Sequence, residues 1–209
     1  MLNIGVLASH GGSNMQAIID RIEAGELEAC IVMVISNNSG SGALERARRH
    51  GLPWRHLSSR THPDRDALDA AIRDALREAG AQLVILAGYM RPIGPKTLAA
   101  FSGRILNIHP ALLPDFGGAG MYGIAPHIAV LQAGARESGA TVHLVTAEYD
   151  TGPVLRQKRV PVLPGDTPET LQQRVLAVEH TLYSDVIADI IAGRITIEGL
   201  EGTGGAEGR

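Results

Sequence analysis

The chain contains a single cysteine, Cys30, among its 209 residues. One thiol cannot form a disulfide within the chain, and its place in the apolar run from residue 29 to 35 favours a small core side chain over a nucleophile. Aromatic residues are also scarce, at 3% of the chain against 25 glycines. We therefore expect an aliphatic core, as in many α/β proteins.

Long apolar runs and concentrated positive charge are missing too. No run reaches the roughly 18 apolar residues of a membrane-spanning helix, and the apolar start, Met1 to Ser9, lacks the basic region of a signal peptide. We expect a cytoplasmic protein with no membrane partner. Lysine and arginine are scattered and the net charge is −3, so the basic stripe that nucleic acid requires is absent. No nucleic-acid partner is expected.

Apolar runs alternate with helical patterns over the first half of the chain. Apolar side chains recur at helical spacing in residues 15–22 and 68–76. The predicted strands between and after them are residues 4–8, 31–35, 83–86 and 105–108. Such alternation is typical of βαβ units and a parallel sheet.

The pattern changes after residue 110. The expected elements there are a Gly-rich and Pro-rich loop at 111–123, a helix at about 126–133, strands at 141–145 and 154–162, and a last helix from about 167. The predicted fold is α/β, a Rossmann-like, mostly parallel sheet flanked by helices, with antiparallel C-terminal strands. We predict one domain over residues 1–195 and a flexible tail over 196–209.

The segment Asn107-Ile108-His109-Pro110 is the strongest candidate site. Alternation along a strand points Asn107 and His109 to the same side, at the carboxyl end where open α/β sheets bind ligands. Asp150, some forty residues later, can set the charge and tautomer of the ring. The alternative is that Asp150 only forms a turn beside Gly152.

A glycine-containing segment, Ser9-His10-Gly11-Gly12-Ser13-Asn14, follows the first predicted strand and opens a helix. Glycine allows close approach of an anion, and free N–H groups at a helix start favour phosphate. The dinucleotide pattern and the P-loop lysine are absent, so a phosphate monoester is favoured over a nucleotide. The alternative is a tight turn in which Ser13 or Asn14 is simply the N-cap.

A third candidate is the strand end and loop from Leu86 to Ile93, which combines apolar groups with free backbone donors and acceptors. Such loops often hold flat heterocycles, although a plain strand-to-loop junction looks similar. His143 and His180 lie in strand and helix patterns without metal-ligand spacing. We expect no metal site.

These motifs resemble one family, the glycinamide ribonucleotide formyltransferases of purine synthesis. The resemblance runs from Leu2 to about Gly193. It is carried by Gly12-Ser13-Asn14, Gly88 to Arg91, Asn107 to Pro114, Thr141 to His143 and Asp150 to Pro153. It implies transfer of the formyl group of 10-formyltetrahydrofolate, a co-substrate, to the amine of glycinamide ribonucleotide (GAR), without a metal.

The resemblance also implies three groups of site residues. The catalytic residues are Asn107, His109 and Asp150. The residues for the phosphate and ribose of GAR are Gly12, Ser13, Asn14, Arg65 and Glu179. The folate-binding residues are Met90, Arg91, Pro92, Ile93, Val145 and Asp150.

In the implied reaction the amine of GAR attacks the formyl carbon, and a negative oxygen develops. Asn107 and protonated His109 stabilise that oxygen, while Asp150 holds the ring charged and helps to move the proton. One departure concerns the segment from residue 115 to 127, which is longer than in many members. Within it, Ala125 stands where related sequences carry a histidine.

Three other functions are alternatives to formyl transfer to GAR. A formyltetrahydrofolate hydrolase usually carries an N-terminal regulatory domain, for which a first strand at Leu2 leaves no room. An initiator-tRNA formyltransferase needs a basic surface and a further C-terminal domain. A non-catalytic nucleotide-binding module leaves Asn107, His109 and Asp150 unexplained. The sequence leaves a homo-oligomer open.

Overall fold

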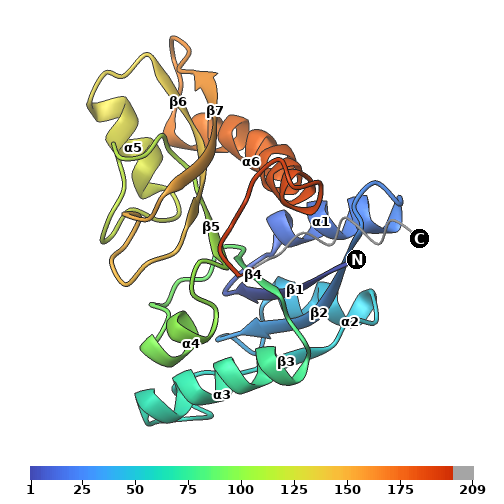
Figure 1. The fold of residues 1–209 in the computed structure, drawn as a ribbon. Helices are drawn as coiled ribbons and strands as arrows, with labels where there is room; N and C mark the ends of the chain where they lie inside the picture. Colours follow the sequence, from blue (N-terminus) through green and yellow to red (C-terminus); the bar gives the residue numbers. More distant parts are fainter. Residues whose placement is uncertain (200–209) are drawn as a thin grey trace, which may run out of the picture.

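A seven-stranded sheet forms the centre of the computed structural model, which describes residues 1–199 (Figure 1). The strands are β1 (Leu2–Ala8), β2 (Ala29–Ser36), β3 (Trp54–His56), β4 (Leu83–Leu86), β5 (Ile105–His109), β6 (Glu137–Leu144) and β7 (Val154–Pro161). The helices are α1 (Ser13–Glu23), α2 (Gly42–Arg49), α3 (Arg65–Glu78), α4 (Pro95–Ala100), α5 (Ala125–Gln132) and α6 (Pro168–Ile191).

The strand order is β3-β2-β1-β4-β5-β6-β7. The pairs from β3 to β5 are parallel, and β6 and β7 add to the sheet in antiparallel pairs. From the central strand β1 the chain first adds β2 and β3 on one side of the sheet and then adds β4 to β7 on the other side. In open α/β sheets the crevice at such a reversal of strand order is the usual ligand site. The predicted fold is confirmed.

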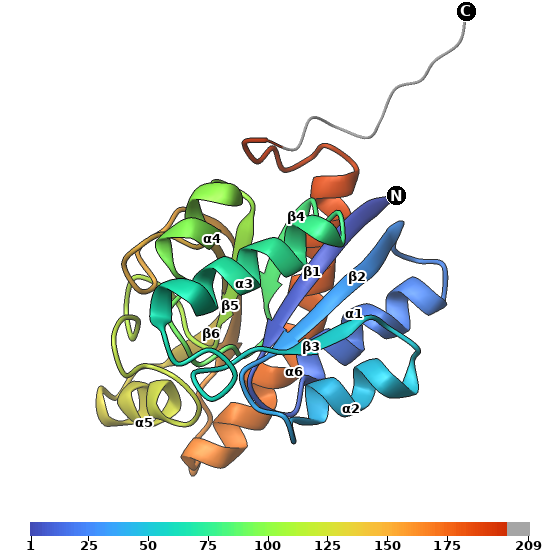
Figure 2. The same ribbon diagram turned by 90° about the horizontal axis from the view of Figure 1, so that it is seen from below.

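Helices cover both faces of the sheet (Figure 2). Side chains of α1, α2, α5 and α6 pack in one apolar cluster, while those of α3 lie in a second cluster on the other face. β1 contributes to both, since Val6 lies in the first cluster and Leu7 in the second. Burial on both faces explains why its sequence is continuously apolar.

The helix starts follow local capping chemistry. Asp64 accepts a hydrogen bond from the N–H of Ala67 at 2.7 Å and is the N-cap of α3. Thr167 caps α6 in a capping box with Thr170. At α1 the N-cap is Gly12 itself, so the interpretation of Ser13 or Asn14 as N-cap is wrong.

Three short elements, α2, β3 and α4, were not predicted. Within residues 1–199 no helix is both long and apolar enough to cross a membrane. Ile197, in the first part of the predicted tail, is buried against the core, and residues 200–209 lie outside the described residues. The division into a domain and a tail stays a prediction.

Candidate active site

A cavity of about 440 Å³ lies at the carboxyl ends of the central strands. Its wall includes Asn107, His109 and Asp150 together with Asn14 and Glu179. The structure thus brings together the three predicted catalytic residues and two of the predicted GAR-binding residues. Their roles stay predictions, but their convergence from β5, α1, α6 and the β6–β7 loop does not depend on the resemblance.

His109 is the last residue of β5, and only 3% of its surface is exposed. Its Nε2 lies 2.8 Å from the carbonyl oxygen of Phe116, and its Nδ1 lies 3.5 Å from Oδ2 of Asp150. Burial lowers the pKa of His109 below its usual 6.5, while the charge of Asp150 and the Phe116 carbonyl oppose this shift. Asp150 acts in the expected direction, but burial outweighs it in the free protein.

Asp150 lies in the loop between β6 and β7, with a left-handed φ of 57°. Its carboxylate accepts the N–H of Gly118 at 2.8 Å and lies 3.5 Å from Nε2 of His143. Burial by itself raises the pKa of Asp150, but the contacts with His143, His109 and Gly118 lower it overall. The residue is therefore an ionised carboxylate, and it both forms the turn and faces the site.

Asn107 is fixed by a residue that the sequence analysis assigned no role, His143. Nδ2 of Asn107 lies 3.0 Å from Nε2 of His143, whose Nδ1 lies 2.9 Å from the carbonyl oxygen of Leu144. If Nδ1–H donates to that carbonyl, Nε2 is the acceptor for the Asn107 amide. The second amide N–H and Oδ1 of Asn107 then remain for a ligand.

His127, on α5, was also missed. Its side chain is buried and lines the same cavity, and its Nδ1 has no hydrogen-bond partner among the described residues. Burial, and secondarily the charge of His109, lower its pKa to about 4. A buried neutral imidazole without a partner is a polar group available to a ligand.

In another part of the cavity wall Nδ2 of Asn14 donates to Oε2 of Glu179 at 2.8 Å. Burial raises the pKa of Glu179, against the opposing effect of this bond. Oδ1 of Asn14 is buried without a hydrogen-bond partner in residues 1–199. Gly12 and Ser13 directly precede Asn14 at the helix start but do not contribute to the cavity wall.

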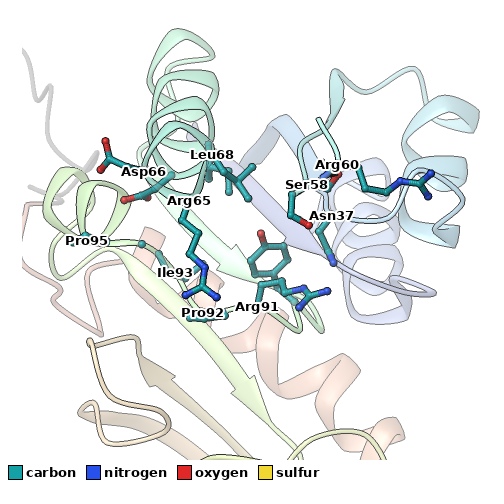
Figure 3. Close-up of a pocket in the computed structure, with 15 residues that line it drawn as sticks. Asn37, Ser58, Arg60, Arg65, Asp66, Leu68, Arg91, Pro92, Ile93 and Pro95 are labelled. Carbon is teal, nitrogen blue, oxygen red and sulfur yellow. Dashed lines mark hydrogen bonds between the residues drawn. The ribbon is translucent and has the colours of Figure 1, made fainter. Parts of the chain in front are cut away.

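Arg65 is the predicted GAR-binding residue that the structure places elsewhere. It lines a second cavity of about 740 Å³, together with Arg91, Pro92 and Ile93. Figure 3 shows Arg65 extending from α3 toward Pro92 and Arg91. The structure therefore groups Arg65 with the predicted folate residues and not with Asn14 and Glu179. Sequence order alone does not indicate that Arg65 lies apart from Asn14 and Glu179.

The predicted folate residues also lie together. Arg91, Pro92, Ile93, Val145 and Asp150 line a small cavity of about 90 Å³. Arg91 belongs to the walls of all three cavities, which makes them neighbours, and the half-exposed Met90 lines the catalytic one. The five-residue grouping agrees with a single binding surface.

The loop that carries Met90 to Ile93 is anchored at both ends. Oγ of Ser9 accepts the N–H of Met90 at 2.8 Å and donates to Oδ1 of Asn37 at 2.6 Å. At the other end the buried Asp69 of α3 accepts the N–H groups of Lys96 (2.7 Å) and Thr97 (3.1 Å). Asp69 thus caps α4 from a neighbouring helix.

The part of the chain that the structure describes shows no cluster of metal ligands. Among residues 1–199 no group of three or more histidine, cysteine, aspartate or glutamate side chains is arranged to hold a metal ion. The polar groups of the cavity are an amide, imidazoles and carboxylates. These groups stabilise a developing charge and move protons.

Comparison with known proteins agrees with this geometry. The formyl transferase family model matches residues 2–187. The chain is 44% identical over 193 residues to the chloroplastic phosphoribosylglycinamide formyltransferase of Arabidopsis thaliana, covering 92% of this chain and 66% of that protein. It is 38% identical over 194 residues to phosphoribosylglycinamide formyltransferase of Escherichia coli K12, covering 93% and 89% of the two chains.

A solved structure shows the same architecture. Glycinamide ribonucleotide transformylase 1 from Symbiobacterium toebii superposes with a TM-score of 0.88 and 45% identity, covering 95% of this chain and 92% of the other. The chain spans just under two thirds of the Arabidopsis relative's length and nearly all of this bacterial structure. With the match extending over β1 to α6, the chain belongs to the formyl transferase family.

Proposed function

We propose that this protein transfers the formyl group of 10-formyltetrahydrofolate to the amine of GAR, giving formyl-GAR and tetrahydrofolate in purine synthesis. The observation that carries this proposal is the convergence of Asn107, His109 and Asp150 in one cavity. The names of the relatives support the choice of substrates.

The two substrates enter this arrangement from opposite walls. GAR is placed with its phosphate at the start of α1 and its ribose beside Asn14 and Glu179, where a buried amide oxygen has no partner among the described residues. The folate lies against the surface formed by Arg91, Pro92 and Ile93 and by the loop that carries Asp150. The formyl carbon then lies between the walls, next to His109.

Arg65 takes a different role in this proposal from the one that the resemblance implied. A folate ends in glutamate carboxylates, and guanidinium groups bind carboxylates in a bidentate manner. Arg65 and Arg91 line the same 740 Å³ cavity. We therefore assign Arg65 to the folate rather than to the phosphate of GAR.

The chemical step is attack of the amine on the formyl carbon. The negative oxygen that develops accepts hydrogen bonds from the Asn107 amide and from Nε2 of His109, taking the place of the Phe116 carbonyl. One preorganised donor of this kind contributes about 2.7–4 kcal/mol to the transition state.

The reaction also requires transfer of a proton from the attacking amine to N10 of the folate. Burial lowers the pKa of His109, so the ring is neutral, and its Nε2–H is the donor to the oxygen. The proton that the attacking nitrogen loses therefore enters at Nδ1, through water, on the side of the ring that faces Asp150. The ionised Asp150 stabilises the resulting imidazolium at its Nδ1 side. The ring then delivers the proton to N10 of the folate as the C–N bond to the formyl group breaks.

The experiment that tests this function compares tetrahydrofolate formation with and without GAR. We expect release of tetrahydrofolate to depend on GAR and to match formyl-GAR in a one-to-one ratio. Equal rates in the absence of GAR would identify a hydrolase instead. The His109→Ala variant serves as the background control in both arms.

Residues 1–195 act as a single catalytic domain, in line with one continuous sheet and its two apolar clusters. The cytoplasmic location and a homo-oligomeric state remain predictions.

A further inference from the structure

The loop before α1 rests on the first turn of α2. The N–H of Ala43 donates to the carbonyl oxygen of His10 at 3.0 Å. Gly12 has a left-handed φ of 71°, and a Cβ at this position would lie 2.9 Å from Cβ of Ala43. Close packing against α2 and the left-handed backbone both require glycine at residue 12.

One turn further along α2, Arg46 joins three elements. Its Nε donates to the carbonyl oxygen of Gly11 at 2.9 Å, and its Nη1 donates to Oε1 of Gln16 at 2.8 Å. Gln16 belongs to α1, so a single guanidinium ties α2, the loop and α1 together. The planar, rigid fork of arginine suits it to fix two acceptors in one geometry.

The loop leaves donors free beside the cavity. Among the described residues no side chain caps α1, and the N–H groups of Ser13 and Asn14 make no hydrogen bond. The side chain of Asn14 is about nine-tenths buried, lines the cavity and keeps an unpartnered Oδ1. Free donors and an unpartnered buried amide at one helix start indicate a ligand there.

Arg46 also makes the loop more favourable for an anion. The carbonyl oxygen of Gly11 precedes the free N–H groups and would repel an anion, but it is engaged by the guanidinium. The nearest acidic side chain on α2, Glu45, is paired with Arg49 at 2.6 Å. The charge of Arg46 also acts on α6: the pKa of His180 is lowered mainly by burial and secondly by Arg46.

We propose that Arg46 is a positioning residue for the phosphate of GAR, holding the Gly11–Gly12 loop so that the N–H groups at the start of α1 face the anion. This inference rests on the proposed function. It assigns Arg46 no contact with the formyl group, so Arg46 sets the affinity for the phosphate and not the chemistry.

The test compares Arg46→Ala and Arg46→Lys with Arg49→Ala, which removes the same charge from the same helix at an exposed position. The readouts are the KM values of both substrates and the affinity for inorganic phosphate by calorimetry. For Arg46→Ala we expect the KM of GAR and the dissociation constant of phosphate to rise together by about tenfold, a change of about 1.4 kcal/mol. The KM of the folate and all values for Arg49→Ala should stay within about twofold.

Arg46→Lys separates position from charge. Lysine keeps the charge but cannot donate from Nε and Nη1 at once, so phosphate binding should stay at least about threefold weaker than in the wild type. Full recovery with lysine, or unchanged phosphate binding in Arg46→Ala, would overturn the proposal. Phosphate binding needs no turnover, so it tests Arg46 even if the wild type forms no formyl-GAR and the proposed function fails.

Discussion

The two walls of the active-site cavity are built in different ways. The wall that we propose binds GAR (the GAR wall) consists of side chains from α1 and α6, joined by the buried Asn14–Glu179 hydrogen bond. The wall that we propose binds the folate (the folate wall) consists of loops, with left-handed backbone at Asp150 and an exposed aromatic residue, Tyr149. A preorganised helical wall suits a small charged ligand, whereas loops present backbone and rings to a large flat one.

The largest expected effect belongs to the residue between the walls. His109→Ala should lower kcat by about two to four orders of magnitude, because it removes both a proton carrier and an oxyanion donor. Binding of both substrates, measured by calorimetry, should survive. His62→Ala is the control, since within residues 1–199 the hydrogen bond of that ring is to Thr61 in its own loop. Near-normal turnover of His109→Ala would leave the ring as packing.

Asp150→Asn should keep the turn and lose the charge. We expect kcat to fall by about tenfold or more, because the imidazolium of His109 loses its partner. Asp150 raises the pKa of His109, so its removal lowers that pKa further and moves the acid limb of the kcat/KM profile to lower pH. Unchanged kinetics with only a shifted melting temperature would show a purely structural Asp150.

Gly12→Val tests the GAR wall alone. The KM of GAR should rise by about tenfold or more, because the side chain collides with Ala43 and blocks the loop, while the KM of the folate stays nearly constant. Gly25→Val is the matched control, since Gly25 has the same left-handed backbone at the other end of α1, and a Cβ added there would meet no atom of the described residues within 4 Å beyond its own chain neighbours. Weakened folate binding with GAR spared would reverse the assignment of the walls.

Asp69→Ala tests the folate wall alone. Loss of the carboxylate frees the N–H groups of Lys96 and Thr97 and loosens the segment before α4, so the KM of the folate should rise by about threefold. The KM of GAR should not change. Thr167→Ala removes a cap from α6 at a cost of about 1 kcal/mol and should leave both KM values alone. Equal effects of the two variants on folate binding would make Asp69 a general stability residue.

The smallest effect concerns His127. Its pKa in the folded protein is about 4, below the usual 6.5, so the unfolded chain binds its proton first as the pH falls. Because of this residue, the free energy of unfolding decreases as the pH falls from about 6.5 to about 4. His127→Gln should make the free energy of unfolding in urea less dependent on pH in that window, whereas His62→Gln should not. An unchanged slope would contradict the buried neutral ring.

The central strands and the segment before α1 could be predicted, because local patterns specify them, whereas Glu179 was expected only from the family resemblance. Alternation along β5 predicted that Asn107 and His109 share a side, and both line the cavity. His143 was assigned no role because its contact with Asn107 depends on the antiparallel register of β5 and β6, which no local pattern encodes. The position of Arg65 beside Arg91, Pro92 and Ile93 could not be predicted for a similar reason, since its neighbours depend on where α3 lies.

The central claim is that the formyl group moves from one wall of the cavity to the other without being released to water. The most direct measurement is ¹³C NMR of a reaction that contains 10-formyltetrahydrofolate labelled in the formyl carbon, GAR and the wild-type protein. The account predicts that the label appears as the formamide of formyl-GAR, in amounts equal to the tetrahydrofolate produced. Accumulation of the label as formate, with GAR unmodified, would contradict it.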